Sequence, residues 1–198
     1  KKTLSKGSSL VVTETCLPIK VYVGHVLNLI EKGVKNIFVP SIQSFAHKIY
    51  NCSKIRGLPD LIRNVVKGDY TIIEATLDKS EKNLGLSEFL KQAVEPFGIK
   101  DENKIQEAIK EGFIRYNNFG VMMQHGMPFD TALKNAKEGK VVINSNPSNK
   151  DVNVALIAHG YNIYDKRVCM DVFKKLEELS VRVYNDYSLT EERLQYCL

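Results

Sequence analysis

The sequence predicts an α/β protein built around a parallel sheet with flanking helices. Strand-type apolar runs alternate with helix-type segments over the first hundred residues, and the alternation returns after residue 150. Between these parts lies a stretch with a helical pattern alone, which predicts a helical insert. The composition, 43% hydrophobic and 26% charged over 198 residues, is that of a globular protein long enough to bury a core.

The first part of the chain is expected to run strand, helix, strand, helix, strand. The run "SSLVVT" (residues 8–13) predicts the first strand, and Pro18 opens a helix that Gly33 ends. "NIFVP" (residues 36–40) is typical of a buried parallel strand. The remaining expected elements are a loop over residues 41–57, a helix over "LPDLIRNVVKG" and a strand over "YTIIEAT" (residues 70–76). This order favours a parallel sheet with right-handed crossovers.

The later part of the chain is expected to form the insert and a second, unfinished α/β unit. A short helix over "SEFLKQAVEPFG" precedes a long helical stretch that Asp101 caps and Pro128 restarts. The polar run "VVINSNPSNKDVN" marks a boundary. Beyond it we expect a strand over residues 152–160, a helix over 166–180, a strand over "VRVYND" and a helix from Thr190.

These elements predict three domains. They are a first α/β lobe (residues 1–100), a helical insert (101–139) and a partial second α/β lobe (140–198). Two strands are too few for a sheet that stands alone, so we expect the natural protein to continue beyond Leu198.

Composition and motifs exclude several classes of protein. The formal net charge of +5 is mild and no long run of like charges occurs, so no nucleic-acid partner is expected. No apolar run approaches the roughly 20 residues that span a bilayer, and no signal peptide is recognisable. The chain carries no Walker loop, no Gly-x-Gly-x-x-Gly after a strand and no Gly-x-Ser-x-Gly. Four cysteines without close-pair spacing fit a reducing cytoplasm rather than a disulfide scaffold or a zinc ribbon.

The first candidate for chemistry is Cys16 in "ETCLPIK". Because Pro18 suits the first turn of a helix, Cys16 is expected just outside a helix N-terminus, where the dipole favours a thiolate. Lys20 could add to this effect, while Glu14 opposes it. Such a thiolate can ligate a metal or act as a nucleophile. The alternative is a small buried hydrophobic residue, as many free cysteines are.

Two further loops have unusual content. The loop after the second strand holds Cys52, and in a parallel sheet Cys52 would lie on the same rim as Cys16. Two thiols are still too few for an iron–sulfur cluster, which needs three or four. The same loop carries His47, Lys54 and Arg56, and His47 is expected to be a solvated loop residue.

The third loop is "AHGYNIYDKR". Its polar side chains could bind a ligand, or they could form a loop whose following helix Asp165 caps. The candidate ligand-binding side chains are His159, Tyr161, Asn162 and Asp165. The three methionines Met122, Met123 and Met127 are expected to fill the core.

Three blocks of sequence carry a family resemblance: "ETCLPIKVYVGHVLNLIEKGVKNIFVP", "CSKIRGLPDLIR" and "VALIAHGYNIYDKRVCMDVFKKLEELSVRV". Together they resemble a domain of unknown function from activase-related proteins of the 2-hydroxyacyl-CoA dehydratase system. Members of that family are often long proteins of anaerobic bacteria that join actin-like ATPase modules to this domain. The domain is itself similar to the dehydratase subunits, which have two Rossmann-like lobes and bind a [4Fe–4S] cluster through cysteines.

The resemblance implies that Cys16 and Cys52 are cluster ligands. Ser53 stands where a proline commonly follows the second cysteine, which weakens the case for Cys52. A further cysteine would be expected after Leu198, so this chain alone is expected to hold no intact cluster. The resemblance also implies a Rossmann-like fold, in which Lys20 and the four polar residues of the third loop could face the cleft. The ATPase modules are absent from this sequence, so ATP hydrolysis is not assigned to it.

Three functions follow from these observations. The favoured one is iron–sulfur-linked electron transfer toward an acyl-CoA-type substrate or a partner. The second is a non-catalytic docking domain between an ATPase module and a dehydratase subunit, with the helical insert as the contact. The third is a metal-free domain that binds a small molecule or CoA, with Lys54, Arg56 and Arg167 meeting phosphates. The sequence leaves open whether the chain is itself an enzyme.

Overall fold

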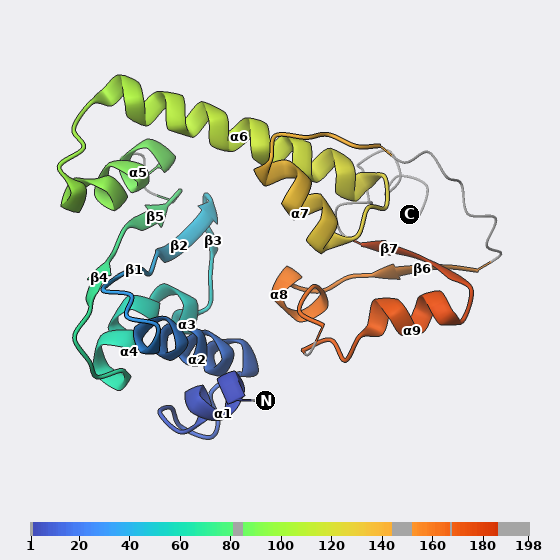
Figure 1. The fold of residues 1–198 in the computed structure, drawn as a ribbon, viewed down its shortest axis with the longest axis horizontal. Coiled ribbons are helices and arrows are strands. Elements are labelled where there is room, and N and C mark those ends of the chain that lie inside the picture. Colours follow the sequence, from blue (N-terminus) through green and yellow to red (C-terminus); the bar gives the residue numbers. More distant parts are fainter. Residues whose placement is uncertain (1, 81–84, 144–151, 167, 186–198) are drawn as a thin grey trace. The chain divides into compact units, whose positions relative to one another are not determined.

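The computed structural model describes residues 2–80, 85–143, 152–166 and 168–185 (Figure 1). The chain divides into two compact units, Lys1–Ile109 and Lys110–Leu198, which we treat separately. Both units mix helices with short strands, so the predicted α/β class is confirmed.

The first unit holds most of the strands. Its helices are α1 (Lys2–Ser8), α2 (Leu17–Glu31), α3 (Ser53–Arg56), α4 (Leu58–Val65), α5 (Leu86–Val94), a 3₁₀ turn (Glu95–Phe97) and the start of α6 (Glu102–Gln124). Its strands are β1 (Asn36–Phe38), β2 (Ser41–Ala46), β3 (Ile49–Tyr50), β4 (Thr71–Ile73) and β5 (Thr76–Asp78). The predicted helices that Pro18 and Pro59 open are therefore confirmed as α2 and α4.

Two parallel strand pairs follow one another along the chain in this unit. β1 pairs with β4, and β2 pairs with β5, both in parallel. Pro40 separates them because it has no N–H to donate to a ladder. Backbone bonds on either side bridge the gap, from the Val39 N–H to the Ile73 carbonyl (2.9 Å) and from the Ser41 N–H to the Ala75 carbonyl (2.8 Å). The result is one kinked parallel pair, which antiparallel β3 extends alongside β2.

Two sequence-based expectations for this unit are wrong. Residues 8–13 do not form a strand: α1 ends at Ser8, and turns lead to Thr15. Residues 41–57 are not a loop, because they form β2, β3 and α3. The predicted third strand is split into β4 and β5. The described strands therefore do not confirm a Rossmann-like topology.

One hydrophobic cluster joins α2, β1 and α4. Its buried members are Ile19, Val23, Val26, Ile37, Val39, Leu58, Ile62 and Val66. Val11, from the misassigned segment, packs against this cluster, whereas its neighbour Val12 is 70% exposed. A strand-like sequence thus lies in turns, because packing outweighs local β propensity there.

Helix α1 is held against α2 by close backbone contact. A Cβ atom on Gly24 would lie 1.9 Å from the Thr3 carbonyl oxygen, and one on Gly7 would lie 1.8 Å from the Lys20 carbonyl oxygen. Polar contacts add to this packing: Asn28 accepts from the Lys6 amino group (3.0 Å) and donates to the Thr3 hydroxyl (3.0 Å). Glycine is therefore required on both helices where they touch.

The second unit contains the rest of α6, then α7 (Phe129–Lys137), β6 (Val152–Leu156), α8 (Gly160–Ile163), α9 (Val172–Glu178) and β7 (Val181–Asn185). β6 and β7 are parallel, with Val152 opposite Val181. The predicted helices at Asp101 and Pro128 are confirmed, and Asp101 caps α6 by accepting from the Asn103 N–H (3.0 Å). The expected helix from Thr190 lies outside the described residues.

The predicted helix over residues 166–180 is shorter than expected. α9 begins only at Val172, because Met170 and Asp171 have left-handed φ angles of 52° and 56°. The core of this unit is a cluster of Phe119, Met122, Met123, Met127, Ala132 and Ala136. The three methionines are thus core residues, as predicted.

We predict that Gly24→Ala destabilises the protein by about 2–3 kcal/mol, since the new methyl group meets backbone rather than a flexible side chain. Urea unfolding followed by circular dichroism measures the change. Gly120→Ala is the matched control. Gly120 also lies within a helix but has open space around it, so alanine should be neutral or stabilising there by up to about 1 kcal/mol. Equal stability of the two variants would contradict the close packing of α1 on α2.

Candidate functional site

Cys16 lies at the N-terminal cap of α2. Its backbone is extended (φ −62°, ψ 150°), its thiol is exposed, and its carbonyl accepts the first helical hydrogen bond from the Lys20 N–H (3.2 Å). Pro18 stands in the first turn, as predicted. The Lys20 amino group donates to the Thr13 carbonyl (2.7 Å), so it is fixed to the turn that precedes the cysteine.

Cys52 has nearly the same local structure at the cap of α3. Its φ and ψ are −63° and 151°, its thiol is exposed, and its carbonyl accepts from the Arg56 N–H (3.1 Å). Both cysteines belong to the unit Lys1–Ile109. The structure thus presents two free, solvent-accessible thiols on matching backbone, whereas the alternative of a buried cysteine does not hold for either.

The premise of the expected rim arrangement, a strand before Cys16 in a wholly parallel sheet, is wrong, and the placement of the two cysteines on one rim stays a prediction. No strand precedes Cys16, because residues 8–13 are a helix end and turns. Cys52 follows β3, which runs antiparallel to β2 and returns the chain toward the start of that strand. The Asn51 side chain donates to the Ile42 carbonyl there (2.8 Å). Cys52 therefore lies beside the beginning of β2, near the Pro40 kink.

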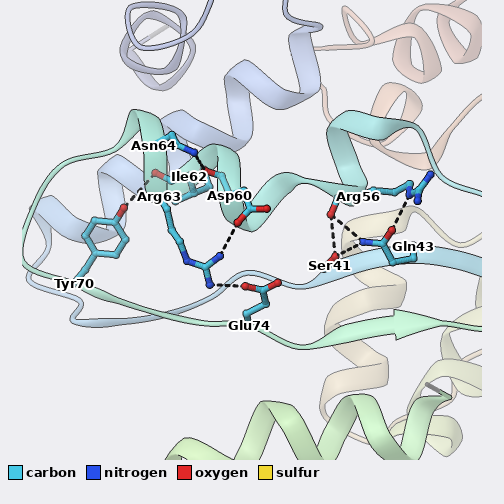
Figure 2. A network of polar contacts seen from close by, with 9 residues as sticks. All are labelled: Ser41, Gln43, Arg56, Asp60, Ile62, Arg63, Asn64, Tyr70 and Glu74. Atoms are coloured by element: carbon cyan, nitrogen blue, oxygen red, sulfur yellow. Dashed lines mark hydrogen bonds and ion pairs between the residues drawn. The ribbon is translucent and has the colours of Figure 1, made fainter. Parts of the chain in front are cut away.

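A polar network joins α3 to β2 (Figure 2). The Arg56 Nε donates to the Gln43 side-chain oxygen (2.7 Å), and the Gln43 amide donates to the Ser41 hydroxyl (2.6 Å). The Ser41 hydroxyl in turn donates to the Arg56 carbonyl (2.9 Å). The Arg56 guanidinium also lies 5.5 Å from the centre of the Tyr50 ring, within cation–π range. Arg56 is thus held through both its backbone and its side chain.

A second network lies between β2 and β5. Ser44 is fully buried, and its hydroxyl donates to the Asp78 carboxylate (2.6 Å). The same carboxylate oxygen accepts from the Ser80 hydroxyl (2.5 Å) and the Ser80 N–H (2.9 Å). These bonds from Ser44 and Ser80 hold the pKa of Asp78 below its usual value, and the positive charge of Arg56 acts in the same direction.

A third group of polar contacts fixes α4 to the following strand. Arg63 lies between two carboxylates in Figure 2, paired with Asp60 (3.0 Å) and Glu74. The hydrogen bond from Arg63 to Glu74 is the main cause of its raised pKa. Tyr70 donates its hydroxyl to the Val66 carbonyl (2.9 Å), and burial raises the pKa of that phenol. These contacts are structural, since each group satisfies a neighbour within the unit.

The predicted ligand loop of the second unit lies at the end of β6. His159 caps α8, and its ring stacks on that of Tyr161 with 5.2 Å between centroids and 15° between planes. Tyr161 is 45% exposed. The Asn162 N–H donates to the His159 carbonyl (2.8 Å), and Asp165 accepts from the Val168 N–H (3.0 Å). His159 and Tyr161 thus form an accessible pair of stacked rings.

The structure brings together no further site from the remaining candidates that it describes. His47 is exposed in the turn between β2 and β3, in agreement with a solvated residue. Cys169 is half-buried in the second unit, and Arg167 and Cys197 lie outside the described residues. Over the described ranges, no group of three or more His, Cys, Asp and Glu side chains is placed to hold a metal ion. Within those same ranges no helix is long and apolar enough to cross a membrane.

Sequence reasoning missed the polar residues of β2 and β5. Ser41, Gln43, Ser44 and Asp78 were expected in a loop or not singled out. The one available signal was the alternation of polar and apolar residues in "SIQSFA", which is typical of a strand.

The comparisons with known proteins identify the family. The model of the CoA enzyme activase uncharacterised domain (DUF2229) matches residues 1–189. The chain therefore belongs to this family, and the resemblance seen in the three sequence blocks is confirmed. No curated protein and no solved structure matches the chain.

We predict that Asp78→Asn removes a pH-dependent part of the stability. Because the folded pKa of Asp78 is depressed, its contribution is complete above the unfolded value near 3.9 and is lost as the pH falls through the folded value. Wild type should therefore lose more stability than Asp78→Asn between pH 5 and pH 3 in urea titrations. Parallel pH curves for the two proteins would contradict this role of the Ser44 and Ser80 hydrogen bonds.

Proposed function

We propose that this domain supplies Cys16 and Cys52 as thiolate ligands of a [4Fe–4S] cluster in a 2-hydroxyacyl-CoA dehydratase-like protein. The observation that carries the proposal is the pair of exposed, free thiols on matching backbone in one compact unit. Thiolates are the usual protein ligands of such clusters. Family membership supports the link to CoA enzyme activation.

The two cysteine thiols are suitable ligands for a cluster, but two ligands are too few to hold one. A [4Fe–4S] cluster takes three or four cysteines. Among the described residues Cys16 and Cys52 are the exposed cysteines, while Cys169 is half-buried in the other unit. We therefore assign these two residues to part of the ligand set, with the remaining ligands coming from elsewhere in the natural protein or from a partner subunit.

The roles of this chain follow from its own residues. Cys16 and Cys52 bind iron, and the caps of α2 and α3 hold the two thiols facing solvent. When bound, the cluster supplies one-electron transfer, here toward an acyl-CoA-type substrate. The actin-like ATPase modules implied by the family resemblance, or a dehydratase subunit, are the proposed partners.

We predict that anaerobic reconstitution with iron and sulfide, carried out on this domain together with the part of the natural protein or the partner subunit that supplies the remaining ligands, gives a protein-bound cluster that depends on both cysteines. Iron, acid-labile sulfide and the absorbance near 400 nm measure it, with about four iron atoms per cluster. Cys16→Ala and Cys52→Ala should each lose most of the bound iron, whereas Cys169→Ala, the matched control, should retain it. Equal iron in wild type and in all three variants would contradict the assignment.

The second candidate function is the metal-free binding of an acyl-CoA. The specific observation in its favour is the exposed stack of His159 and Tyr161 at the end of β6, since planar bases stack on aromatic side chains. Ligands of open α/β sheets also bind beyond the carboxyl ends of parallel strands. In this function the cysteines would be structural.

We predict for this second candidate that acetyl-CoA raises the melting temperature of the protein and that Tyr161→Ala removes most of the shift. A ligand that binds the native state stabilises it, and loss of one stacking ring costs about 1–3 kcal/mol of binding. Tyr116→Ala is the control, because Tyr116 is 58% exposed on α6. Absence of a shift with wild type, together with absence of iron in the reconstitution, would leave the docking function, for which α6 exposes Phe113 and Tyr116.

A further inference from the structure

Strand β4 has one edge without a strand partner among the described residues. Its other edge binds β1: the Thr71 N–H donates to the carbonyl of the residue before β1 (2.7 Å), and the Ile73 carbonyl accepts from the Val39 N–H (2.9 Å). Because backbone groups alternate between the two edges of a strand, those of Ile72 and Glu74 face away from β1. Neither of these two N–H groups has a hydrogen-bond partner in the described part of the chain, and Figure 1 shows no described strand beyond β4 within this unit.

The opposite edge of the sheet is interrupted by a proline. The N–H groups of Val39 and Ser41 point toward β4 and β5, so Pro40 between them faces outward, where it has no N–H to offer a further strand. Prolines on edge strands are a common protection against pairing. Beyond Pro40, antiparallel β3 already covers β2. The edge of β4 is therefore the more open one, and a two-stranded sheet usually needs further strands to be stable.

A surface hollow of about 480 Å³ borders this open edge. Its lining includes Arg63, Lys67, Tyr70 and Ile72. Arg63 is already paired with two carboxylates. Lys67 is exposed and has no ion-pair partner among the residues that the structure describes. The hollow therefore holds one uncompensated positive charge.

We propose that the open edge of β4 pairs antiparallel with β4 of a second copy of this chain. Such a pairing is twofold symmetric, so each contact occurs twice. Residues whose backbone groups face outward lie opposite one another in the hydrogen-bonded positions, so Ile72 lies opposite either Ile72 or Glu74 of the second copy. A pairing centred on Glu74 would also need the Thr76 N–H, which already donates to the Gln92 side chain (2.8 Å).

Both registers bring Glu74 of the second copy to the hollow, where Lys67 lies. In them Glu74 is opposite Ile72 or Tyr70, and both of these residues line the hollow. In Figure 2 the side chains of Tyr70 and Glu74 point toward α4, and opposite residues of an antiparallel pair lie on the same face. Charged residues on an edge commonly oppose pairing, but here a carboxylate meets a cation. This charge complementarity favours a second copy as the occupant.

Sedimentation velocity of the full chain from about 10 µM to about 1 mM measures the association. We expect a weak dimer, and Lys67→Glu should raise its dissociation constant about tenfold, because two carboxylates then meet at both contacts. Glu74→Lys should weaken the dimer similarly, because two cations meet. Mixing these two variants should restore association, since both contacts of the mixed dimer again join unlike charges. Lys54→Glu, the matched control, makes the same change in net charge on α3 and should leave association unchanged.

Hydrogen exchange at single amides, followed by NMR, locates the contact. Exchange at Ile72 and Glu74 should slow at least about fivefold from the lowest to the highest concentration, because pairing occupies both N–H groups. The Phe38 amide is the control. It faces outward on the opposite edge of the same sheet, so its exchange should not depend on concentration.

The outcomes are independent of the cluster proposal. A dimer with protected Ile72 and Glu74 amides, restored by mixing the two charge variants, supports the inference whether or not the domain binds iron. A monomer at every concentration overturns it, and the edge would then be open to a strand of a different protein. A dimer that leaves those two amides unprotected, or that mixing fails to restore, has its interface elsewhere and also overturns the inference.

Discussion

The first unit depends on one hydrophobic cluster, because the turns that carry Cys16 and Cys52 are both attached to it. Buried side chains of α2, β1 and α4 form the cluster, and each aliphatic residue buried there contributes about 1.5–3 kcal/mol. Ile19 fixes the first turn of α2 behind Cys16, and Ile55 fixes α3 behind Cys52. The positions of the two exposed thiols are therefore set mainly by the apolar contacts of the isoleucine one turn later in the chain. The polar residues make a smaller contribution.

Local patterns predicted the elements that carry their own signals. Pro18 and Gly33 bound α2, Asp101 caps α6, and the apolar runs at β1 and β6 form strands, as the sequence indicates. The strand predicted over residues 8–13 does not form, because no described strand pairs with its valines. The contact of Gly7 with α2 instead continues a helix up to Ser8. Such a contact depends on two backbone segments that are separated in the sequence, so a short window of sequence does not predict it.

The candidate site could be predicted only in part for a related reason. Cys16 and Cys52 were found because a cysteine near a helix start has an evident chemical meaning. The network of Ser41, Gln43 and Arg56 has no recognisable pattern in the sequence. Its hydrogen bonds form only after β3 reverses the chain and brings α3 beside β2. The same reversal makes β3 antiparallel to β2, whereas the expectation for the two cysteines assumed one parallel sheet throughout.

Cys16 and Cys52 have nearly the same backbone, but the basic residue four positions later is a lysine in one case and an arginine in the other, and this difference has a physical consequence. Lys20 carries its charge on a single nitrogen, which is already bound to the Thr13 carbonyl, so it acts as a point charge close to its own chain. Arg56 uses Nε for its anchor and keeps a planar pair of Nη donors, a geometry suited to a two-point hydrogen bond with an anion. Its field already reaches Asp78, whose pKa it helps to lower. The basic side chain after Cys52 is therefore held with a fixed guanidinium plane, whereas the one after Cys16 offers a single charged nitrogen that is already bound to its own chain.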